Sequence, residues 1–315
     1  MKDVIEAIDK EVIKQELKRV RYIRRTNNGD NEIYFFTHFE SPILMQEIGR
    51  LRELTFRYAG GGTGKESDVD KYDLGDKPYH QLVVWDPEKE EFLGGYRFIL
   101  GNEVEFDPQG VPLIATSGLL NFTPKFINEY LPFTIELGRS FVQPHYQVRS
   151  AGRKALYALD NLWDGLGALI VEYPNMKYFF GKVTMYTHFN RLARDYMLYF
   201  LKSQFPDRVG LMSPKEPLSY ETDVEHLKTL FLSDDYKENY KELSAKVRAL
   251  GELIPPLINS YMSISSTMMS FGTAMNYSFG NVEETGLIIT IPDIFESKKE
   301  RHIDTYLSEL KSRNQ

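Results

Sequence analysis

The chain has 315 residues, a net charge of −7, 42% hydrophobic residues and no cysteine. Its length suits one large α/β domain or two small ones, and its composition is typical of a globular protein. The negative charge argues against a general nucleic-acid binder, and the missing cysteines exclude disulfides, thiolate metal sites and a cysteine nucleophile.

In the first half of the chain, the spacing of apolar residues and the turn residues predict alternating helices and strands. In chain order we expect a helix over 3–25, a strand over 31–39, a helix from Ser41-Pro42 to about Tyr58, and a hairpin of strands over 81–86 and 91–100. A proline at an early helical position favours the second helix start.

The second half continues this alternation. We expect a strand over 134–143, a helix over 153–173, a strand over 177–186, a helix over 190–205, polar helical sequence over 221–250, a strand over 286–295 and a helical tail. Helices that join neighbouring strands predict an α/β fold with mixed strand directions. We divide the chain into an N-terminal helix (1–30) and a single domain (31–315) with a helical elaboration at about 216–285.

The sequence lacks several signatures of other protein classes. The N-terminus is charged throughout and has no apolar signal-peptide core, and no run of about 18 apolar residues predicts a membrane span. We therefore expect a cytoplasmic protein. The loop Gly60–Glu66 departs from a phosphate-binding loop, since Ala59 replaces its first glycine and Glu66 its Ser or Thr, so we interpret it as a mobile loop. Scattered histidines predict no metal site, and no G-x-S-x-G motif supports a serine hydrolase.

Charged residues inside otherwise apolar segments are the main functional signal. They occur on the second helix, in the loop after the glycines and in two strands, as Arg52, Asp70, Asp73, Arg97, Glu136 and Arg139. Such charges are unfavourable in a core unless they are paired. They therefore indicate either salt bridges that position loops on the sheet, or a pocket with a carboxylate base and anion-binding arginines. An unbulged strand would direct Glu136 and Arg139 to opposite faces.

In this order these segments resemble a known pattern. The segments are Arg52–Phe56, Asp70–Asp73, Gly94–Phe98 and Glu136–Ser140, followed by Val142, Pro144, Tyr146, Leu162-Trp163, Phe180–Val183, Ile254–Ile258 and Tyr261-Met262. They resemble the acyl-homoserine-lactone synthases and, more closely, the ornithine-lipid type N-acyltransferases of the GNAT superfamily, a branch often labelled as hemolysins. The resemblance covers roughly residues 40–295. The strand Gly181–Tyr186 is similar to enzymes that make N-acyl glycine lipids.

The resemblance implies a fold and a reaction. The fold would be a GNAT-like central mixed sheet with flanking helices and a C-terminal helical elaboration. The reaction would move a (3-hydroxy)fatty acyl group from acyl carrier protein to the amino group of glycine or ornithine, in amino-acid lipid synthesis. No cofactor would be bound permanently, because the acyl-phosphopantetheine thioester is a co-substrate. Glu136 would be the base, and Arg97 and Arg139 would clamp the acceptor carboxylate or support Glu136.

Further residues receive expected roles from the same pattern. Arg52, Asp70 and Asp73 would shape the substrate site and order the loop over it. Four aromatic residues would line an acyl tunnel or simply pack the core, namely Phe56, Trp85, Phe98 and Phe141. A basic helix start would bind the phosphopantetheine phosphate through free N–H groups and side chains, at Arg149, Gly152, Arg153 and Lys154.

Two other functions share these features. An acyl-homoserine-lactone synthase shares the first four segments, but the long C-terminal extension with Ile254–Leu257 argues against it. A non-catalytic protein that binds acyl carrier protein or a membrane surface would bind without turnover, and the presence of Glu136 argues against it. An apolar product would place the enzyme in peripheral contact with the inner leaflet of the membrane.

Overall fold

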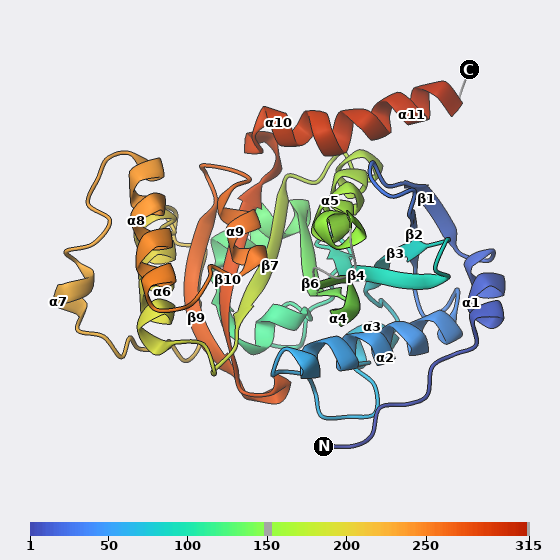
Figure 1. The fold of residues 1–315 in the computed structure, drawn as a ribbon, viewed down its shortest axis with the longest axis horizontal. Helices are drawn as coiled ribbons and strands as arrows, with labels where there is room; N and C mark the ends of the chain where they lie inside the picture. Colours follow the sequence, from blue (N-terminus) through green and yellow to red (C-terminus); the bar gives the residue numbers. More distant parts are fainter. Residues whose placement is uncertain (148–152, 314–315) are drawn as a thin grey trace.

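The computed structural model describes residues 1–147 and 153–313 (Figure 1). Its centre is an eight-stranded sheet in the order β1-β2-β3-β4-β6-β7-β10-β9. The strands are β1 (Arg21–Arg25), β2 (Glu32–Phe36), β3 (His80–Asp86), β4 (Glu91–Leu100), β6 (Thr134–Val142), β7 (Tyr178–Met185), β9 (Met269–Asn276) and β10 (Val282–Thr290). Neighbours are antiparallel except for β6 and β7, which are parallel. The predicted mixed α/β sheet is confirmed.

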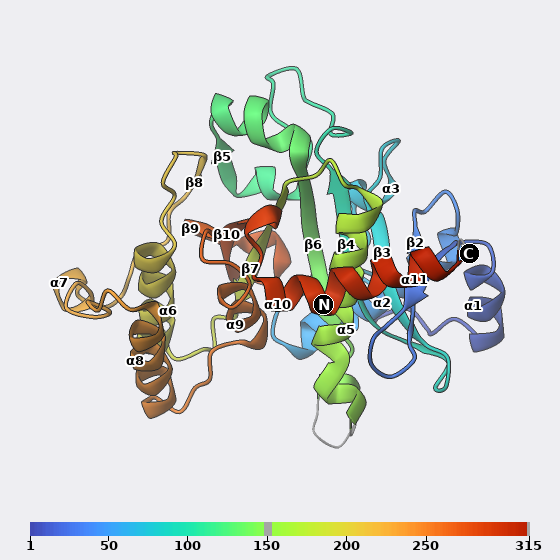
Figure 2. The same cartoon turned by 90° about the horizontal axis from the view of Figure 1, so that it is seen from above.

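Helices cover both faces of this sheet. They are α1 (Lys10–Leu17), α2 (Pro42–Tyr58), α3 (Lys71–Leu74), α4 (Pro144–Gln147), α5 (Arg153–Glu172), α6 (Arg191–Gln204), α7 (Val224–Leu227), α8 (Tyr236–Ala249), α9 (Pro256–Met262), α10 (Glu296–Lys299) and α11 (Thr305–Arg313). Figure 2 shows α5 and α11 crossing the near face, with α2 behind the sheet. Each face has its own hydrophobic core, one against α5 and one against α2.

A third core extends the α2 face beside β7, β9 and β10. It lies beneath the two-stranded sheet of β5 (Leu120–Phe122) and β8 (Met212–Pro214). Phe180 and Ile288 contribute to this core, whereas their sequence neighbours Phe179 and Ile289 pack against α5. This alternation follows from the two-residue period of a strand. It places successive residues of β7 and β10 on opposite faces of the sheet.

Two predicted helices differ from the structure, and the elaboration expected to be helical at about 216–285 also contains the strand β9 and the start of β10. The helix expected over 3–25 covers only Lys10–Leu17, and Arg21–Arg25 instead forms β1 at the edge of the sheet. Val20 packs in the core on the α2 side, whereas Ile23 of β1 packs in the core on the α5 side. The polar segment 221–250 contains two helices, α7 and α8, and Phe231 between them adopts a left-handed conformation that a continuous helix excludes.

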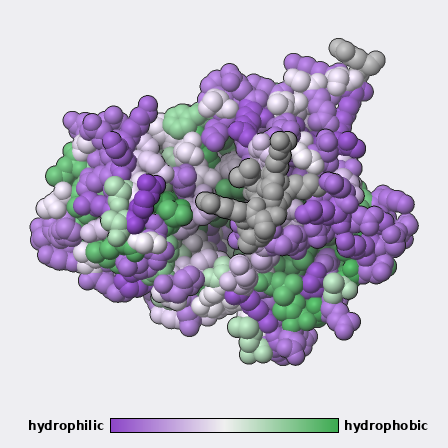
Figure 3. Space-filling model, in the orientation of Figure 1, coloured by the Kyte–Doolittle hydropathy of each residue, from purple (hydrophilic) through white to green (hydrophobic). Residues whose placement is uncertain are grey.

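None of the helices within 1–147 and 153–313 combines the length and apolar composition needed to span a bilayer. The face in Figure 3 is mostly hydrophilic, and its hydrophobic side chains gather in patches, one of them at the lower right in the region of α2.

Candidate active site

The parallel strands β6 and β7 separate part of the way along their length. They pair only from Thr134 opposite Tyr178 to Glu136 opposite Phe180, although β6 continues to Val142 and β7 to Met185. A cavity of about 190 Å³ occupies the opening. Its walls come from α2, β4, β6, β7, α9, β10 and the segments beside them, and include Phe56, Tyr96, Leu137, Gly138, Arg139, Ser140, Lys182, Thr184, Tyr186, Leu257, Tyr261, Phe279 and Glu284.

A β-bulge in β6 shapes one wall of this cavity. Arg97 of β4 faces Gly138, whereas Gly95 faces Phe141, so β6 holds one extra residue between these pairs. Arg139 lies within the bulge with φ 49°. The bulge reverses the strand's alternation, because Leu137 packs against α5 while Phe141 packs against α2. Glu136 and Arg139 therefore lie on the same face, and the opposite-face expectation for an unbulged strand does not apply.

Arg52 and Arg97 anchor a buried charge cluster on that face. Each arginine is 1% exposed. Arg52 donates to Asp73 at 2.9 Å and to Asp68 at 3.1 Å. Arg97 donates to Asp70 at 2.8 Å and to Asp73 at 3.0 Å. Paired in this way, the two guanidinium groups fix the loop before α3 on the sheet.

Arg139 completes the cluster and links it to the cavity. Its guanidinium lies 2.8 Å from a carboxylate oxygen of Asp68 and 3.6 Å from one of Asp70. The same guanidinium stacks over the Phe279 ring at 4.2 Å. Asp68 was not among the residues singled out from the sequence, although its position two residues before Asp70 was the available signal. Three arginines thus face three aspartates.

The charges of this cluster support one another. Burial alone would raise the pKa of Asp73, but the neighbouring Arg52 and Arg97 outweigh it and hold that pKa well below its usual range. For Asp68 too, burial is opposed by arginine charges, and the net result is a lowered pKa. Asp70 and Asp73 also form the capping box of α3. Asp68 and Asp73 are therefore ionised at neutral pH, and their ion pairs hold the loop in place.

Glu136 lies under the cluster with both of its oxygen atoms engaged. It is 2% exposed, accepts a hydrogen bond from the Tyr79 hydroxyl, and accepts another from the Thr116 N–H at 3.0 Å. Burial raises its pKa in spite of these bonds. The adjacent Leu137, rather than Glu136, lines the cavity. The role of Glu136 as a base stays a prediction.

The predicted aromatic residues divide between cavity and core. Phe56 lines the cavity and meets the Phe279 ring edge-on, with 4.9 Å between centroids. Trp85 and Phe141 lie in the core beside α2, and Phe98 lies in the core beside α5. None of these three side chains lines the cavity between β6 and β7.

The predicted phosphate-binding segment is largely outside the described part of the chain. Arg149 and Gly152 fall between its two ranges, and Arg153 and Lys154 are described only as backbone at the start of α5. The glycine-rich loop is described, and it is anchored. Glu53 of α2 accepts hydrogen bonds from the backbone N–H groups of Thr63 and Gly64 at 3.0 and 2.8 Å. The loop expected to be mobile is thus tied to α2.

Several cavity residues escaped the sequence reasoning. Lys182 of β7 forms an ion pair with Glu284 of β10, and Glu284 is 3% exposed. Both are charges in otherwise apolar strands, which is the same signal that identified Arg97. The hydroxyl groups of Tyr96, Ser140 and Tyr261 belong to residues of the same wall. Burial raises the pKa of Tyr96 to about 12, so its phenol stays protonated and can donate at neutral pH.

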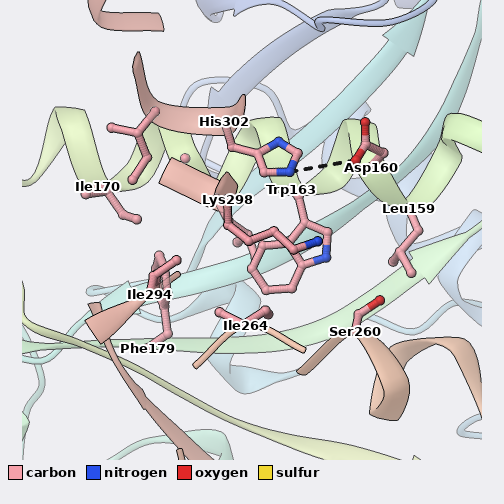
Figure 4. A pocket seen from close by; sticks show the side chains of 13 residues that line it. Leu159, Asp160, Trp163, Ile170, Phe179, Ser260, Ile264, Ile294, Lys298 and His302 are labelled. Atoms are coloured by element: carbon pink, nitrogen blue, oxygen red, sulfur yellow. Dashed lines mark ion pairs between the residues drawn. The ribbon is translucent and has the colours of Figure 1, made fainter. Parts of the chain in front are cut away.

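A second cavity lies on the α5 face (Figure 4). It measures about 230 Å³, and its apolar lining includes Leu159, Trp163, Leu166, Ile170, Phe179, Ile264 and Ile294. Lys298, His302 and Asp160 add polar groups, and the last two are 3.7 Å apart. The Trp163 ring meets the Tyr261 ring edge-on at 5.9 Å. Since Tyr261 also lines the first cavity, this ring pair separates the two.

Neither cavity has the composition of a metal site. Within the two described ranges, no group of three or more His, Asp or Glu side chains is arranged to hold a metal ion. The chemistry that these walls offer is therefore ionic recognition, hydrogen bonding by hydroxyl groups and apolar contact.

Comparisons with known proteins agree with this geometry. Residues 51–156 match the acetyltransferase (GNAT) domain family. A curated "Glycine N(alpha)-acyltransferase" of Bacteroides thetaiotaomicron is 56% identical over 307 residues, which cover 98% of this chain and 91% of that protein. A protein of the same name from Phocaeicola vulgatus is 55% identical over 309 residues, covering 98% of this chain and 95% of its own. No solved structure gives a significant match.

Proposed function

We propose that this chain, which belongs to the GNAT N-acyltransferases, transfers a fatty acyl group from a phosphopantetheine thioester to the amino group of glycine. The name of two relatives that match 98% of the chain supports glycine as the acceptor. The observation that carries the proposal is the cavity between β6 and β7, which is charged toward one face of the sheet and apolar toward the other.

The two sides of this cavity suit two different substrates. Phe179 and Val183 of β7 pack against α5, and Lys182 lies on the other face of the same strand. It shares that face with Arg139 of the bulge. On the α5 face the cavity meets Leu137, Tyr96 and Tyr261. A small zwitterion would thus enter from the α2 face, and an acyl thioester from the α5 face.

The transfer joins these substrates in the opening. The amine nitrogen attacks the thioester carbonyl carbon, a C–N bond forms and the C–S bond breaks. Starting from the ammonium form, one proton passes to a base and another to the departing thiolate. Beyond Glu136, the backbone of β6 no longer pairs with β7, so its N–H groups on that side can donate to the oxyanion.

Glu136 is our candidate for the base. Its raised pKa brings it closer to the working range of a general base. Because its oxygen atoms already accept two hydrogen bonds, proton transfer would run through a water or through the Tyr79 hydroxyl. The Nη1 atom of Arg97 donates to both Asp70 and Asp73, so we assign Arg97 to positioning the loop rather than to the acceptor.

The apolar cavity beside α5 is our candidate for the acyl chain. Leucine and isoleucine side chains form much of its lining, and the contacting rings of Trp163 and Tyr261 lie between it and the opening between β6 and β7. Acyl carrier protein would present the thioester, with the basic start of α5 near the phosphate. The enzyme would then need no permanently bound cofactor, and its amphiphilic product would favour peripheral membrane contact.

A product assay by mass spectrometry tests this proposal. Purified protein is mixed with 3-hydroxyacyl carrier protein or the corresponding coenzyme A thioester, and with glycine, ornithine, serine or S-adenosylmethionine in separate reactions. We expect N-acyl glycine in the glycine reaction with the carrier-protein donor. A lactone from S-adenosylmethionine would instead identify a homoserine-lactone synthase, and a product made only from ornithine would overturn the choice of acceptor.

A further inference from the structure

We propose that Lys182 and Glu284 form the acceptor subsite, in which Lys182 binds the carboxylate of the amino acid and Glu284 binds its ammonium group. This inference rests on the proposed function and adds the residues that would select a free amino acid over other amines. Neither residue belongs to the charge cluster around Arg52 and Arg97.

The two residues lie side by side on neighbouring strands. Where β7 pairs with β10, Glu284 of β10 lies opposite Thr184 of β7. Lys182 lies two residues before Thr184 on β7, so the Lys182 and Glu284 side chains are on the same face of the sheet. Their side chains form an ion pair, and both line the cavity between β6 and β7. The Lys182 side chain is 13% exposed and that of Glu284 is 3% exposed. The pair is therefore mostly shielded from solvent yet open to the cavity.

Glu284 is held in one orientation. The Asn276 side-chain amide donates to its Oε2 atom at 2.8 Å, which is also the atom that Lys182 contacts. The Thr184 hydroxyl approaches the other atom, Oε1, at 3.3 Å. A carboxylate oxygen accepts more than one hydrogen bond, and the long contact at Oε1 leaves room for a donor from the cavity. An ammonium group of the substrate would supply such a donor and a charge opposite to that of Glu284.

Lys182 has donors left for a carboxylate. Its ammonium group carries three N–H donors, and Glu284 is the carboxylate that engages it within the described residues. Arg139, the other cation of this wall, is instead held by Asp68 and Asp70. Lys182 is thus the cation with more capacity for a substrate anion.

Stability alone does not explain a buried pair at this position. Replacing such a pair by well-packed apolar residues is often neutral or stabilising. Lys182 and Glu284 present opposite charges next to each other, which is the complement of an amino-acid zwitterion. The cavity is small, and the rings of Phe56, Tyr186 and Phe279 bound it. An acceptor without a side chain fits this space best, which favours glycine.

The test compares glycine with ethylamine, an amine of similar size that lacks the carboxylate. The variants are Lys182→Met, Lys182→Arg and Glu284→Gln. The control is Lys228→Met, which replaces an exposed lysine at the end of α7. Lys182→Met should raise the KM for glycine by about 10- to 100-fold, the range for losing a charge-assisted hydrogen bond. The KM for the acyl donor should change little. Lys182→Arg should retain most of the glycine affinity.

The preference for glycine over ethylamine separates substrate binding from a structural role. The wild type should strongly prefer glycine, and Lys182→Met should lose that preference because it removes the cation that binds the carboxylate of glycine. The double variant Lys182→Met/Glu284→Gln leaves no unpaired buried charge, so it provides a folded form if Lys182→Met melts early. Unchanged glycine KM and unchanged preference in folded variants would overturn this inference while leaving the proposed function intact. A wild-type protein that acylates no amino acid would overturn both this inference and the proposed function.

Discussion

Replacing Asp73 by asparagine removes one negative charge from the centre of the buried cluster. Asp73 accepts from Arg52 at 2.9 Å and from Arg97 at 3.0 Å, and both arginines are 1% exposed. Asparagine keeps the shape of the side chain but leaves the cluster with an excess positive charge. Breaking a buried ion pair in this way lowers the free energy of unfolding by about 3–5 kcal/mol. That is a large fraction of the roughly 5–15 kcal/mol of a typical domain.

Urea unfolding followed by tryptophan fluorescence measures this loss. The matched control is Asp76→Asn, three residues further along the chain at an exposed position, which should change the free energy of unfolding by less than about 0.5 kcal/mol. The slope of the transition should stay the same in all three proteins while the midpoint of Asp73→Asn falls. A loss below about 1 kcal/mol for Asp73→Asn would refute the argument that the cluster stabilises the loop on the sheet.

Three further predictions follow from the same contacts. Glu136→Gln should fold normally, as judged by circular dichroism, and lose about 100-fold or more in kcat, and a fully active variant would eliminate Glu136 as the base. Trp163→Ala removes a ring between the two cavities, so a series of acyl donors should show a shift of preference toward longer chains, and an unchanged series would place the acyl chain elsewhere. Because Asp68 and Asp73 have lowered pKa values in the folded state, the unfolded chain binds more protons in acid. Their contribution to the free energy of unfolding should be complete above about pH 4 and should decline as the pH falls below that value. Asp73→Asn should weaken this pH dependence, which urea unfolding at several pH values measures.

Local sequence patterns predicted most of the sheet and the helices that cover it. Ser41 and Pro42 mark the start of α2, and the Ser41 side chain accepts from the Leu44 N–H at 3.0 Å. The hairpin of β3 and β4 and the strand β6 also form where their patterns place them. The curated relatives confirm the resemblance to the amino-acid N-acyltransferases of the GNAT superfamily.

Long-range pairing was beyond those patterns. Residues Arg21–Arg25 form a strand only because the edge of β2 offers backbone partners. The bulge at Arg139 depends on the register between β4 and β6, which no local spacing encodes. Lys182 and Glu284 meet through the pairing of β7 with β10, about a hundred residues apart in the chain. Of the two interpretations of the charged residues, salt bridges that position a loop describe Arg52 and Arg97. The cavity arises where β6 and β7 separate, which the charged residues did not indicate.

We expect glycine to be the amine that receives the acyl group. The most direct measurement is a competition in one reaction, with one acyl donor and equal concentrations of glycine, alanine, serine and ornithine, quantified by mass spectrometry. We predict that N-acyl glycine dominates the products, since the small charged cavity admits an amino acid without a side chain. A mixture led by any larger amino acid would contradict the account.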